Sequence, residues 1–181
     1  MFKIVAACDI IKERNEIMAE KYSCRTYTNV EDLINDPEVE LVDIATRSID
    51  HYKHAKMALD AGKNVLVEKP FGRNRFECND LIKTAKDNGV KLAVFQQTFF
   101  APFFIHAYNL AKSGKLGDIK QVNIRYNGLS RRWDWQTLQS SVAGSLYNSG
   151  PHPIGQALDF LGFDDNTEVA FSSLKRVLTS G

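Results

Sequence analysis

The chain has 181 residues, of which 44% are hydrophobic and 25% charged, and its formal net charge is +1; these values are ordinary for a globular protein. It has no basic block or stripe of the kind that binds nucleic acid, and no apolar run approaches the roughly 20 residues of a membrane-spanning helix. The three cysteines, Cys8, Cys24 and Cys78, lack metal-ligand spacing and are typical of reduced thiols in a cytoplasmic protein. We therefore expect no nucleic-acid partner, no membrane partner and no metal site.

Predicted strands and helices alternate through the first half of the chain. Apolar runs predict strands over residues 2–8, 41–45, 64–67 and 90–95. Helical spacing predicts helices over residues 11–22, 30–34, 51–61 and 74–88, with Asn29 as an N-cap and with Gly62 and Gly89 as terminating residues. This alternation predicts an α/β fold with a doubly wound parallel sheet.

The pattern changes after the last of these strands, and we place a domain boundary near Gln97. The sequence then predicts a helix over residues 102–112, a strand over 119–126, a loop to about 144, a helix over about 145–161 and an extended stretch within 167–178. Two domains are expected, at residues 1–97 and 98–181, and the second has α+β character.

The run Asn-Val-Leu-Val-Glu-Lys-Pro, from Asn64 to Pro70, joins a short buried strand to a lysine at its end. Open α/β sheets bind ligands at the carboxyl ends of their parallel strands, so Lys69 is expected at a ligand site. Such a site can lower the pKa of a lysine and let it accept or donate a proton. The alternative is that Lys69 and Pro70 form an ordinary surface turn.

Several motifs around this run occur in the same order and spacing as in a known enzyme family. Residues 41–97 include Leu-Val-Asp-Ile-Ala-Thr, then His51, then Ala-Leu-Asp-Ala-Gly-Lys-Asn-Val-Leu-Val-Glu-Lys-Pro, and later Gly-Val-Lys-Leu-Ala-Val. From about residue 2 to about residue 162, the chain resembles the Gfo/Idh/MocA family of glucose-fructose oxidoreductases and inositol dehydrogenases. The resemblance implies an NAD(P)-dependent oxidoreductase that transfers a hydride between nicotinamide and a sugar, cyclitol or related polyol.

The same resemblance implies an architecture of two domains. The first would be a Rossmann-like NAD(P)-binding domain. The second would hold a large, mainly antiparallel sheet, and family members usually form homo-oligomers through that sheet.

The resemblance places cofactor-binding residues at the carboxyl ends of the predicted strands. Asp9, which ends the first strand, would bond the adenosine ribose hydroxyls and so favour NAD over NADP, although Arg14 lies about one helical turn further on. Alternatively, Asp9 is an N-cap or turn residue. His51 would contact the nicotinamide half or simply lie in the first turn of a helix. The other cofactor-side candidates are Thr46, Arg47, Ser48, Glu68, Lys69 and Gln97.

A second cluster, Tyr147-Asn148-Ser149-Gly150-Pro151-His152, resembles the family's Asp-x-Gly-x-His signature. The resemblance implies that Lys69 and His152 move the hydroxyl proton of the substrate, with Asn148 orienting in place of the usual Asp. Because Asn148 and His152 are four residues apart, one helical face can present both side chains. Gly155 stands where another Asp is frequent in the family. The alternative is a capped helix start with a buried histidine.

Two further segments bear on the ligand. Phe99 and Phe100 stand near the place where the family frequently has an Arg-Phe pair, which suggests a less anionic ligand or a different contact. The loop after residue 126 carries arginine and tryptophan, which suit stacking on a sugar-like substrate and a protein interface equally well. These loop residues are Arg131, Arg132, Trp133 and Trp135.

One expected feature of a dinucleotide-binding domain is absent from the sequence. No Gly-x-Gly-x-x-Gly run follows a strand, so we expect the first βα unit and its pyrophosphate loop to be missing and two strand edges to lack partners. The resemblance also stops short of a full second domain, so the chain is expected to be truncated at both ends. The alternative function is therefore a non-catalytic remnant or an interaction module that pairs through exposed sheet edges.

Overall fold

The computed structural model describes residues 2–128, 133–162, 164 and 166–173. It divides the chain into two compact units, Met1–Phe95 and Gln96–Gly181. Arg131, Arg132 and the end of the predicted stretch 167–178 lie outside the described residues. None of the helices in the described ranges is long and apolar enough to cross a membrane.

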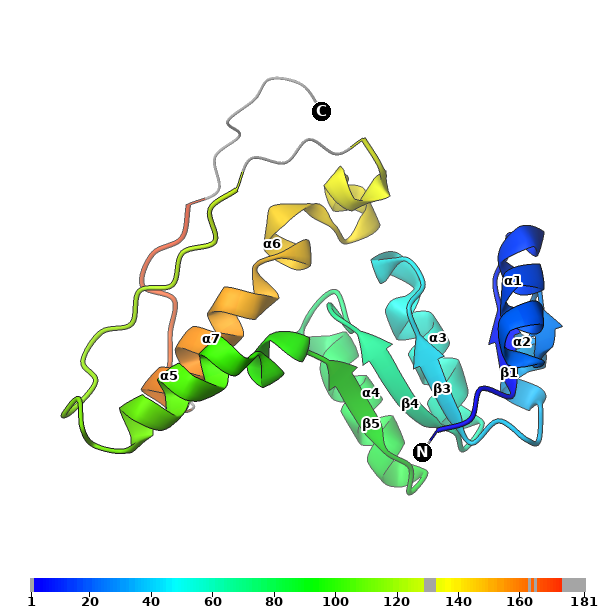
Figure 1. Ribbon diagram of the computed structural model, residues 1–181, viewed down its shortest axis with the longest axis horizontal. Coiled ribbons are helices and arrows are strands. Elements are labelled where there is room, and N and C mark those ends of the chain that lie inside the picture. The colour runs from blue at the N-terminus through cyan, green and yellow to red at the C-terminus, as the bar shows by residue number, and fades with distance from the viewer. Residues whose placement is uncertain (1, 129–132, 163, 165, 174–181) are drawn as a thin grey trace. The chain divides into compact units, whose positions relative to one another are not determined.

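The first unit alternates strands and helices, as predicted (Figure 1). One of its strands, β2, was not predicted, because it is only three residues long and lacks an apolar run. The unit comprises β1 (Ala6–Cys8), α1 (Lys12–Tyr22), β2 (Arg25–Tyr27), α2 (Val30–Asn35), β3 (Leu41–Ile44), η1 (Ser48–Asp50), α3 (His51–Asp60), β4 (Asn64–Glu68), α4 (Arg75–Asp87) and β5 (Leu92–Phe95).

The five strands of this unit form two parallel sheets, one with the order β1-β2 and one with the order β3-β4-β5. In the larger sheet Ile44 lies beside Val67 and Glu68 lies beside Phe95. Among the described strands, β4 alone has two neighbours, and β1, β2, β3 and β5 each have a single neighbour.

Two helices, α3 and α4, cover one face of the three-stranded sheet (Figure 1). Alternate residues of β3 and β4 face these helices and are buried, which gives the sheet one apolar face. The buried core contains Ile34, Val39, Val42, Ile44, Ala55, Ala58, Leu59, Val65, Val67, Leu81 and Ala85.

Glycines end the two core helices at the predicted places. Gly62 has a φ of +73° and Gly89 a φ of +66°, a left-handed conformation that costs little without a Cβ. After α3, the Lys63 amide donates to the Ala58 carbonyl over 2.9 Å and the Gly62 amide to the Leu59 carbonyl over 3.0 Å. These two bonds form a Schellman motif, which turns the chain sharply into β4.

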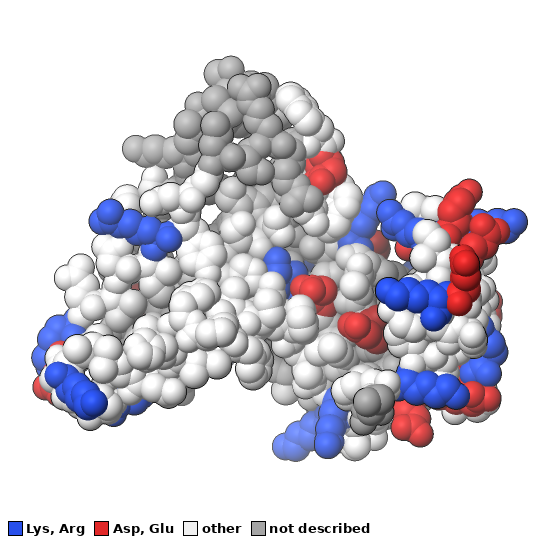
Figure 2. Space-filling model, viewed as in Figure 1, with Lys and Arg blue, Asp and Glu red and all other residues white. Residues whose placement is uncertain are grey.

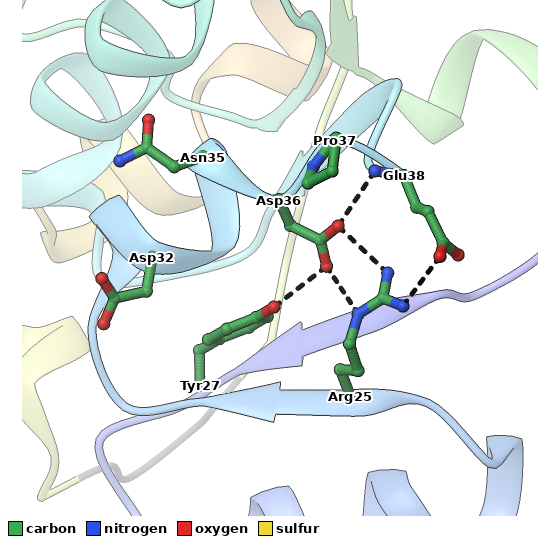
Figure 3. Close-up of a pocket in the computed structure, with 7 residues that line it drawn as sticks. All are labelled: Arg25, Tyr27, Asp32, Asn35, Asp36, Pro37 and Glu38. Carbon is green, nitrogen blue, oxygen red and sulfur yellow. Dashed lines mark hydrogen bonds and ion pairs between the residues drawn. The ribbon is translucent and has the colours of Figure 1, made fainter.

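An ion-pair network, the Asp36 cluster, ties β2 to the loop between α2 and β3 and lines a shallow pocket (Figure 3). The Asp36 side chain is 3% exposed and accepts bonds from Arg25 Nε (2.7 Å) and Nη2 (3.0 Å), the Tyr27 hydroxyl (3.0 Å) and the Glu38 amide (2.9 Å). The bond from the Glu38 amide, followed by those from Arg25 and Tyr27, lowers the pKa of Asp36 despite its burial. Arg25 also pairs with Glu38, so one guanidinium joins two carboxylates and braces β2 against the loop.

The second unit is helical in its described residues. It comprises η2 (Gln97–Phe100), α5 (Pro102–Lys112), η3 (Trp135–Thr137), η4 (Gln139–Ser141), α6 (Gly144–Asn148) and α7 (Pro151–Leu161). Helix α5 has the predicted bounds. The core of the second unit is aromatic. Phe104, which is 5% exposed, contacts the rings of Phe99, Tyr108 and Phe160 at centroid distances of 5.4, 5.8 and 5.5 Å.

Two predictions for the second unit are wrong. Residues 119–126 do not form a strand, because no described strand pairs with them, and the antiparallel sheet implied by the family resemblance is not formed by the described residues. The single helix predicted over 145–161 is two helices, α6 and α7. The break follows from Pro151 and Pro153, which lack the amide hydrogens that would bond back to the preceding turn.

Charge is distributed differently over the two units. In Figure 2, Lys and Arg are interspersed with Asp and Glu over the part of the first unit that carries α1 and α2. The surface over α5 and α7 is mostly uncharged in the same view, since each helix holds one charged residue, Lys112 and Asp159. Because both signs of charge are interspersed over α1 and α2, this surface does not present a strong electrostatic potential of one sign.

We expect Asp36→Asn to lower the midpoint of urea-induced unfolding of the full chain at pH 7, because an amide cannot pair with Arg25. The folded-state pKa of Asp36 is lowered, so its stabilising contribution is complete above the unfolded-state value of about 3.9 and is lost as the pH falls through the folded-state value. The difference between wild type and variant should therefore shrink below about pH 4.

Unfolding followed by circular dichroism at pH 7, 4 and 3 measures this difference. The control is Asp60→Asn, which removes an exposed pair with Lys56 and should change the midpoint little. Equal effects of the two substitutions, or a difference that does not change with pH, would contradict the assigned role of Asp36.

Candidate functional site

The carboxyl ends of β3 and β4 bring predicted cofactor-side residues to one edge of the larger sheet. The two strands pair in parallel, so the segments that follow them leave the sheet on the same side. This is the edge at which open α/β domains bind ligands. The predicted residues placed there are Thr46, Arg47, Ser48, Glu68 and Lys69.

His51 bridges the segments that follow the two strands. Its ring is 2% exposed, with Nδ1 2.8 Å from the Pro70 carbonyl oxygen and Nε2 3.0 Å from the Thr46 carbonyl oxygen. Both partners only accept hydrogen bonds, and a neutral imidazole can donate to one of them at a time. Of the two predicted roles, this geometry favours the structural one, in the first turn of α3.

Lys69 lies directly after β4 and is half-buried. Burial lowers the pKa of its ammonium group, and the Glu68 carboxylate opposes this shift. The Lys69 amide donates to Glu68 Oε2 over 3.2 Å, so the carboxylate is held beside the lysine backbone. A lysine whose charged form is disfavoured can exchange a proton nearer to neutral pH than an exposed one.

The turn after Lys69 is braced by an ion pair that the sequence reasoning missed. The Glu77 carboxylate, 4% exposed, pairs with Arg73 and accepts bonds from the Arg73 amide (2.7 Å) and Nε (2.5 Å). Asn74 caps α4 by accepting the Glu77 amide over 3.0 Å. The signal was in the sequence, because an N-cap residue followed three positions later by Glu has the spacing of a capping box.

Asp9 directly follows β1 and holds the start of α1. Its carboxylate accepts the Ile11 amide (2.9 Å) and pairs with Arg14 Nη1 (3.1 Å), with side chains that are 29% and 64% exposed for Asp9 and Arg14. The Asp9 amide donates to Asn15 Oδ1 over 3.0 Å, and Asn15 Nδ2 donates to the Asp9 carbonyl oxygen over 2.7 Å. Asp9 is therefore a turn residue, which is one of its two predicted roles. It also lies at a strand end, which is the position that the predicted role of ribose ligand requires.

His152 lies in the first turn of α7, and Asn148 is the last residue of α6; both side chains are half-buried. We expected one face of a continuous helix to present both residues, but they lie in two separate helices. His152 Nδ1 lies 3.2 Å from Thr98 Oγ1, a partner that the sequence reasoning did not identify. Gln97, predicted on the cofactor side, opens η2 next to Thr98 and is exposed.

Gly155, which stands where another Asp is frequent in the family, packs closely against Phe99 of η2. A Cβ at this position would lie 3.0 Å from Phe99 Cζ and 3.5 Å from Gln96 Nε2. A side chain at position 155 would therefore require the Phe99 ring to shift by a few tenths of an ångström. This close approach is invisible in the sequence, because Phe99 and Gly155 belong to separate helices.

The predicted catalytic residues divide between the two units: Lys69 belongs to the first, and Asn148 and His152 belong to the second.

The predicted loop that carries arginine and tryptophan is described in part. Its Trp133 is 83% exposed, and Trp135 is the first residue of η3. In the residues that the structure describes, no group of three His, Cys, Asp or Glu side chains could hold a metal ion.

Comparison with known proteins extends this description. The family model of NAD-binding Rossmann-fold oxidoreductases, GFO_IDH_MocA, matches residues 1–96. The chain is 32% identical to the uncharacterized oxidoreductase YhhX of Escherichia coli over 161 residues, which cover 88% of this chain and 46% of YhhX. It is 33% identical to the scyllo-inositol 2-dehydrogenase (NADP+) IolW of Bacillus subtilis over 135 residues, covering 74% of this chain and 38% of IolW.

The crystal structure of an NAD-binding protein from Listeria innocua matches with a TM-score of 0.79 and 26% identity, over 85% of this chain and 46% of that chain. The chain thus spans less than half the length of these relatives. The family match covers the parallel sheets and the carboxyl-edge residues described above. On this evidence the chain belongs to the Gfo/Idh/MocA family of oxidoreductases.

Proposed function

We propose that the chain carries the cofactor-side and proton-transferring residues of an NAD(P)-dependent oxidoreductase acting on a sugar, cyclitol or related polyol. The observation that carries this proposal is Lys69, a half-buried lysine with a lowered pKa at the carboxyl end of a parallel strand. Family membership supports the reaction class.

Oxidation of an alcohol requires that its hydroxyl proton be removed, and Lys69 is suited to hold that proton. Burial disfavours the ammonium form, so a neutral amine is available to accept the proton, and the ammonium can return it in the reverse reaction. His152 would share this proton transfer, and Asn148 would orient the hydroxyl by hydrogen bonds. Residues 1–97 would hold the cofactor and residues 98–181 the substrate and the contacts of a homo-oligomer.

The residues present fit the two ends of a nicotinamide dinucleotide. Asp9 offers a carboxylate at a strand end, where it would bond the adenosine ribose, and the residues after β3 and β4 would border the nicotinamide half. The sequence supplies no glycine-rich loop for the pyrophosphate. When bound, the cofactor would supply the hydride acceptor or donor for the carbinol carbon.

Two observations support a polyol substrate. IolW, which shares 33% of its aligned residues with this chain, is named for an inositol substrate. Phe99 packs in the aromatic core of the second unit, and Phe100 is 79% exposed, where an arginine would favour an anionic ligand. A neutral polyhydroxylated compound therefore fits the chain better than a carboxylated or phosphorylated one.

Asp9 favours NAD, and Arg14 is placed to soften this preference. A carboxylate repels the 2′-phosphate of NADP, whereas a nearby guanidinium accommodates it. We expect Asp9→Ala to weaken NADH binding about tenfold, through lost ribose hydrogen bonds, and to leave NADPH binding unchanged or stronger. Arg14→Ala should weaken NADPH binding about tenfold and NADH binding little.

Titration of the full chain with each dinucleotide, followed by nicotinamide fluorescence, measures these affinities. Lys12→Ala, in the same turn of α1 but paired with Glu16, is the matched control and should change neither affinity by more than about threefold. Parallel losses of NADH and NADPH affinity in both site variants would contradict the assignment of Asp9 and Arg14 to the ribose end.

We expect Lys69→Met to lower the rate constant of polyol oxidation by about 100-fold or more, because it removes the proton acceptor while keeping a side chain of similar length. NADH affinity should change less than about threefold. Steady-state kinetics with a panel of inositols and sugar alcohols provides the rate. Lys53→Met, an exposed lysine of α3, is the control and should retain the wild-type rate. A Lys69→Met rate equal to that of the control would refute the role.

A second candidate function is an interaction module that pairs through exposed sheet edges. The observation that favours it is the single neighbour of β1, β2, β3 and β5 among the described residues. The same titration separates the two functions. A chain that binds neither dinucleotide at millimolar concentration, yet associates with increasing protein concentration in sedimentation, would support the module.

A further inference from the structure

We propose that Thr98 is the positioning residue of His152, and that it holds the imidazole through a hydroxyl able both to accept and to donate a hydrogen bond. Thr98 Oγ1 lies 3.2 Å from His152 Nδ1, and both residues are half-buried in the second unit. This inference rests on the proposed function of His152 as an acid and base, which requires an orienting group at the other ring nitrogen.

Hydrogen bonds fix the segment that carries Thr98 against α7. Gln156, which is 3% exposed, donates from Nε2 to the Thr98 carbonyl over 3.2 Å. Gln96 donates from Nε2 to the Pro151 carbonyl over 2.8 Å. These bonds lie on either side of His152 in the sequence of α7, so they hold the Thr98 backbone beside the ring.

Close packing holds the same junction. The Phe99 ring approaches Gly155 so closely that a Cβ would lie 3.0 Å from Cζ, and it makes an edge contact with Phe104 at a centroid distance of 5.4 Å. A Cβ at position 155 would require the Phe99 ring to shift by a few tenths of an ångström. The glycine therefore favours the close packing of η2 on α7 beside Thr98 and His152.

A hydroxyl orients a histidine differently from a carboxylate. When Thr98 Oγ1 accepts from Nδ1–H, Nε2 is the nitrogen with a lone pair and can take a proton; the resulting imidazolium still donates from Nδ1 to Oγ1. In the reverse direction the imidazolium returns this proton from Nε2 and keeps its hydrogen bond from Nδ1 to Oγ1. When Oγ1 instead donates to Nδ1, Nε2–H belongs to the neutral ring, which cannot accept a proton at Nε2. A hydroxyl that accepts from Nδ1 thus supports both directions of the proton transfer without adding a charge.

At two positions near His152 where the family frequently has Asp, this chain has no carboxylate. Asn148 has an amide where the family signature has Asp, and Gly155 has no side chain where another Asp is frequent. Neither residue can stabilise an imidazolium by charge. Thr98 supplies a neutral hydrogen bond to the Nδ1 side of the His152 ring.

The test reads the protonation of the His152 ring directly. The chain has four histidines, so long-range ¹H–¹⁵N correlation spectra of the full chain contain four imidazoles, and the one lost in His152→Gln is assigned to His152. At a pH where the rings are neutral, the ¹⁵N shifts of Nδ1 and Nε2 show which nitrogen carries the proton. The variants are Thr98→Val, which keeps the shape and removes the hydroxyl, and Thr98→Ser, which keeps the hydroxyl.

We expect Thr98→Val to shift the balance of the two His152 tautomers, Thr98→Ser to restore it, and the other three imidazoles to stay unchanged. Thr137→Val, which removes a hydroxyl bonded to the Asp134 carbonyl, is the control and should leave His152 as in wild type. Identical ¹⁵N shifts of His152 in wild type, Thr98→Val and Thr98→Ser would overturn the inference. If Thr98→Val does not fold, Thr98→Ala provides the same comparison.

Kinetics separates this inference from the proposed function. In an active chain, Thr98→Val should lower kcat about tenfold or more with KM changed less than about threefold, and Thr98→Ser should recover most of the loss. A tautomer shift in a chain that oxidises no polyol would support the positioning role and refute the proposed function. Polyol oxidation with an unresponsive His152 ring would refute the positioning role alone.

Discussion

The parallel pairing of β3 and β4 is the constraint on which the candidate site depends. It sends the segments after both strands out of the same sheet edge, and the His51 ring then bonds a carbonyl of each, at 3.0 Å to Thr46 and 2.8 Å to Pro70. The buried core formed with α3 and α4 fixes the strands beneath. Burial at the end of β4 lowers the pKa of Lys69, and the Glu68 carboxylate opposes this shift.

In the second unit, helices position the proposed proton-transferring residue His152. Pro151 and Pro153 break the chain of helical hydrogen bonds and start α7 where His152 can face η2. Side-chain amides of Gln96 and Gln156 then tie η2 to α7, as His51 ties two loops in the first unit. In both units a polar side chain bonded to backbone carbonyls holds the segment that carries the proposed proton-transferring residue.

Strand and helix order in the first unit followed from the sequence because apolar runs, N-caps and terminating glycines all agreed. Asn29 caps its helix as predicted, and Gly62 and Gly89 have the positive φ expected after a helix. The pattern failed for β2, whose polar residues are defined by pairing with β1. It failed for residues 119–126 for the opposite reason, since alternation alone makes no strand without a partner. The Thr98–His152 contact joins residues 54 apart, a distance that no local pattern spans.

The central claim is that the end of β4 prepares Lys69 to exchange a proton, and an NMR titration of the lysine side chains in the full chain tests it most directly. With ¹³C-labelled lysine, the Cε resonance that disappears in Lys69→Met identifies the residue. The account predicts that this resonance titrates below the ordinary lysine pKa of about 10.4. A Lys69 resonance that titrates at or above that value would contradict the account.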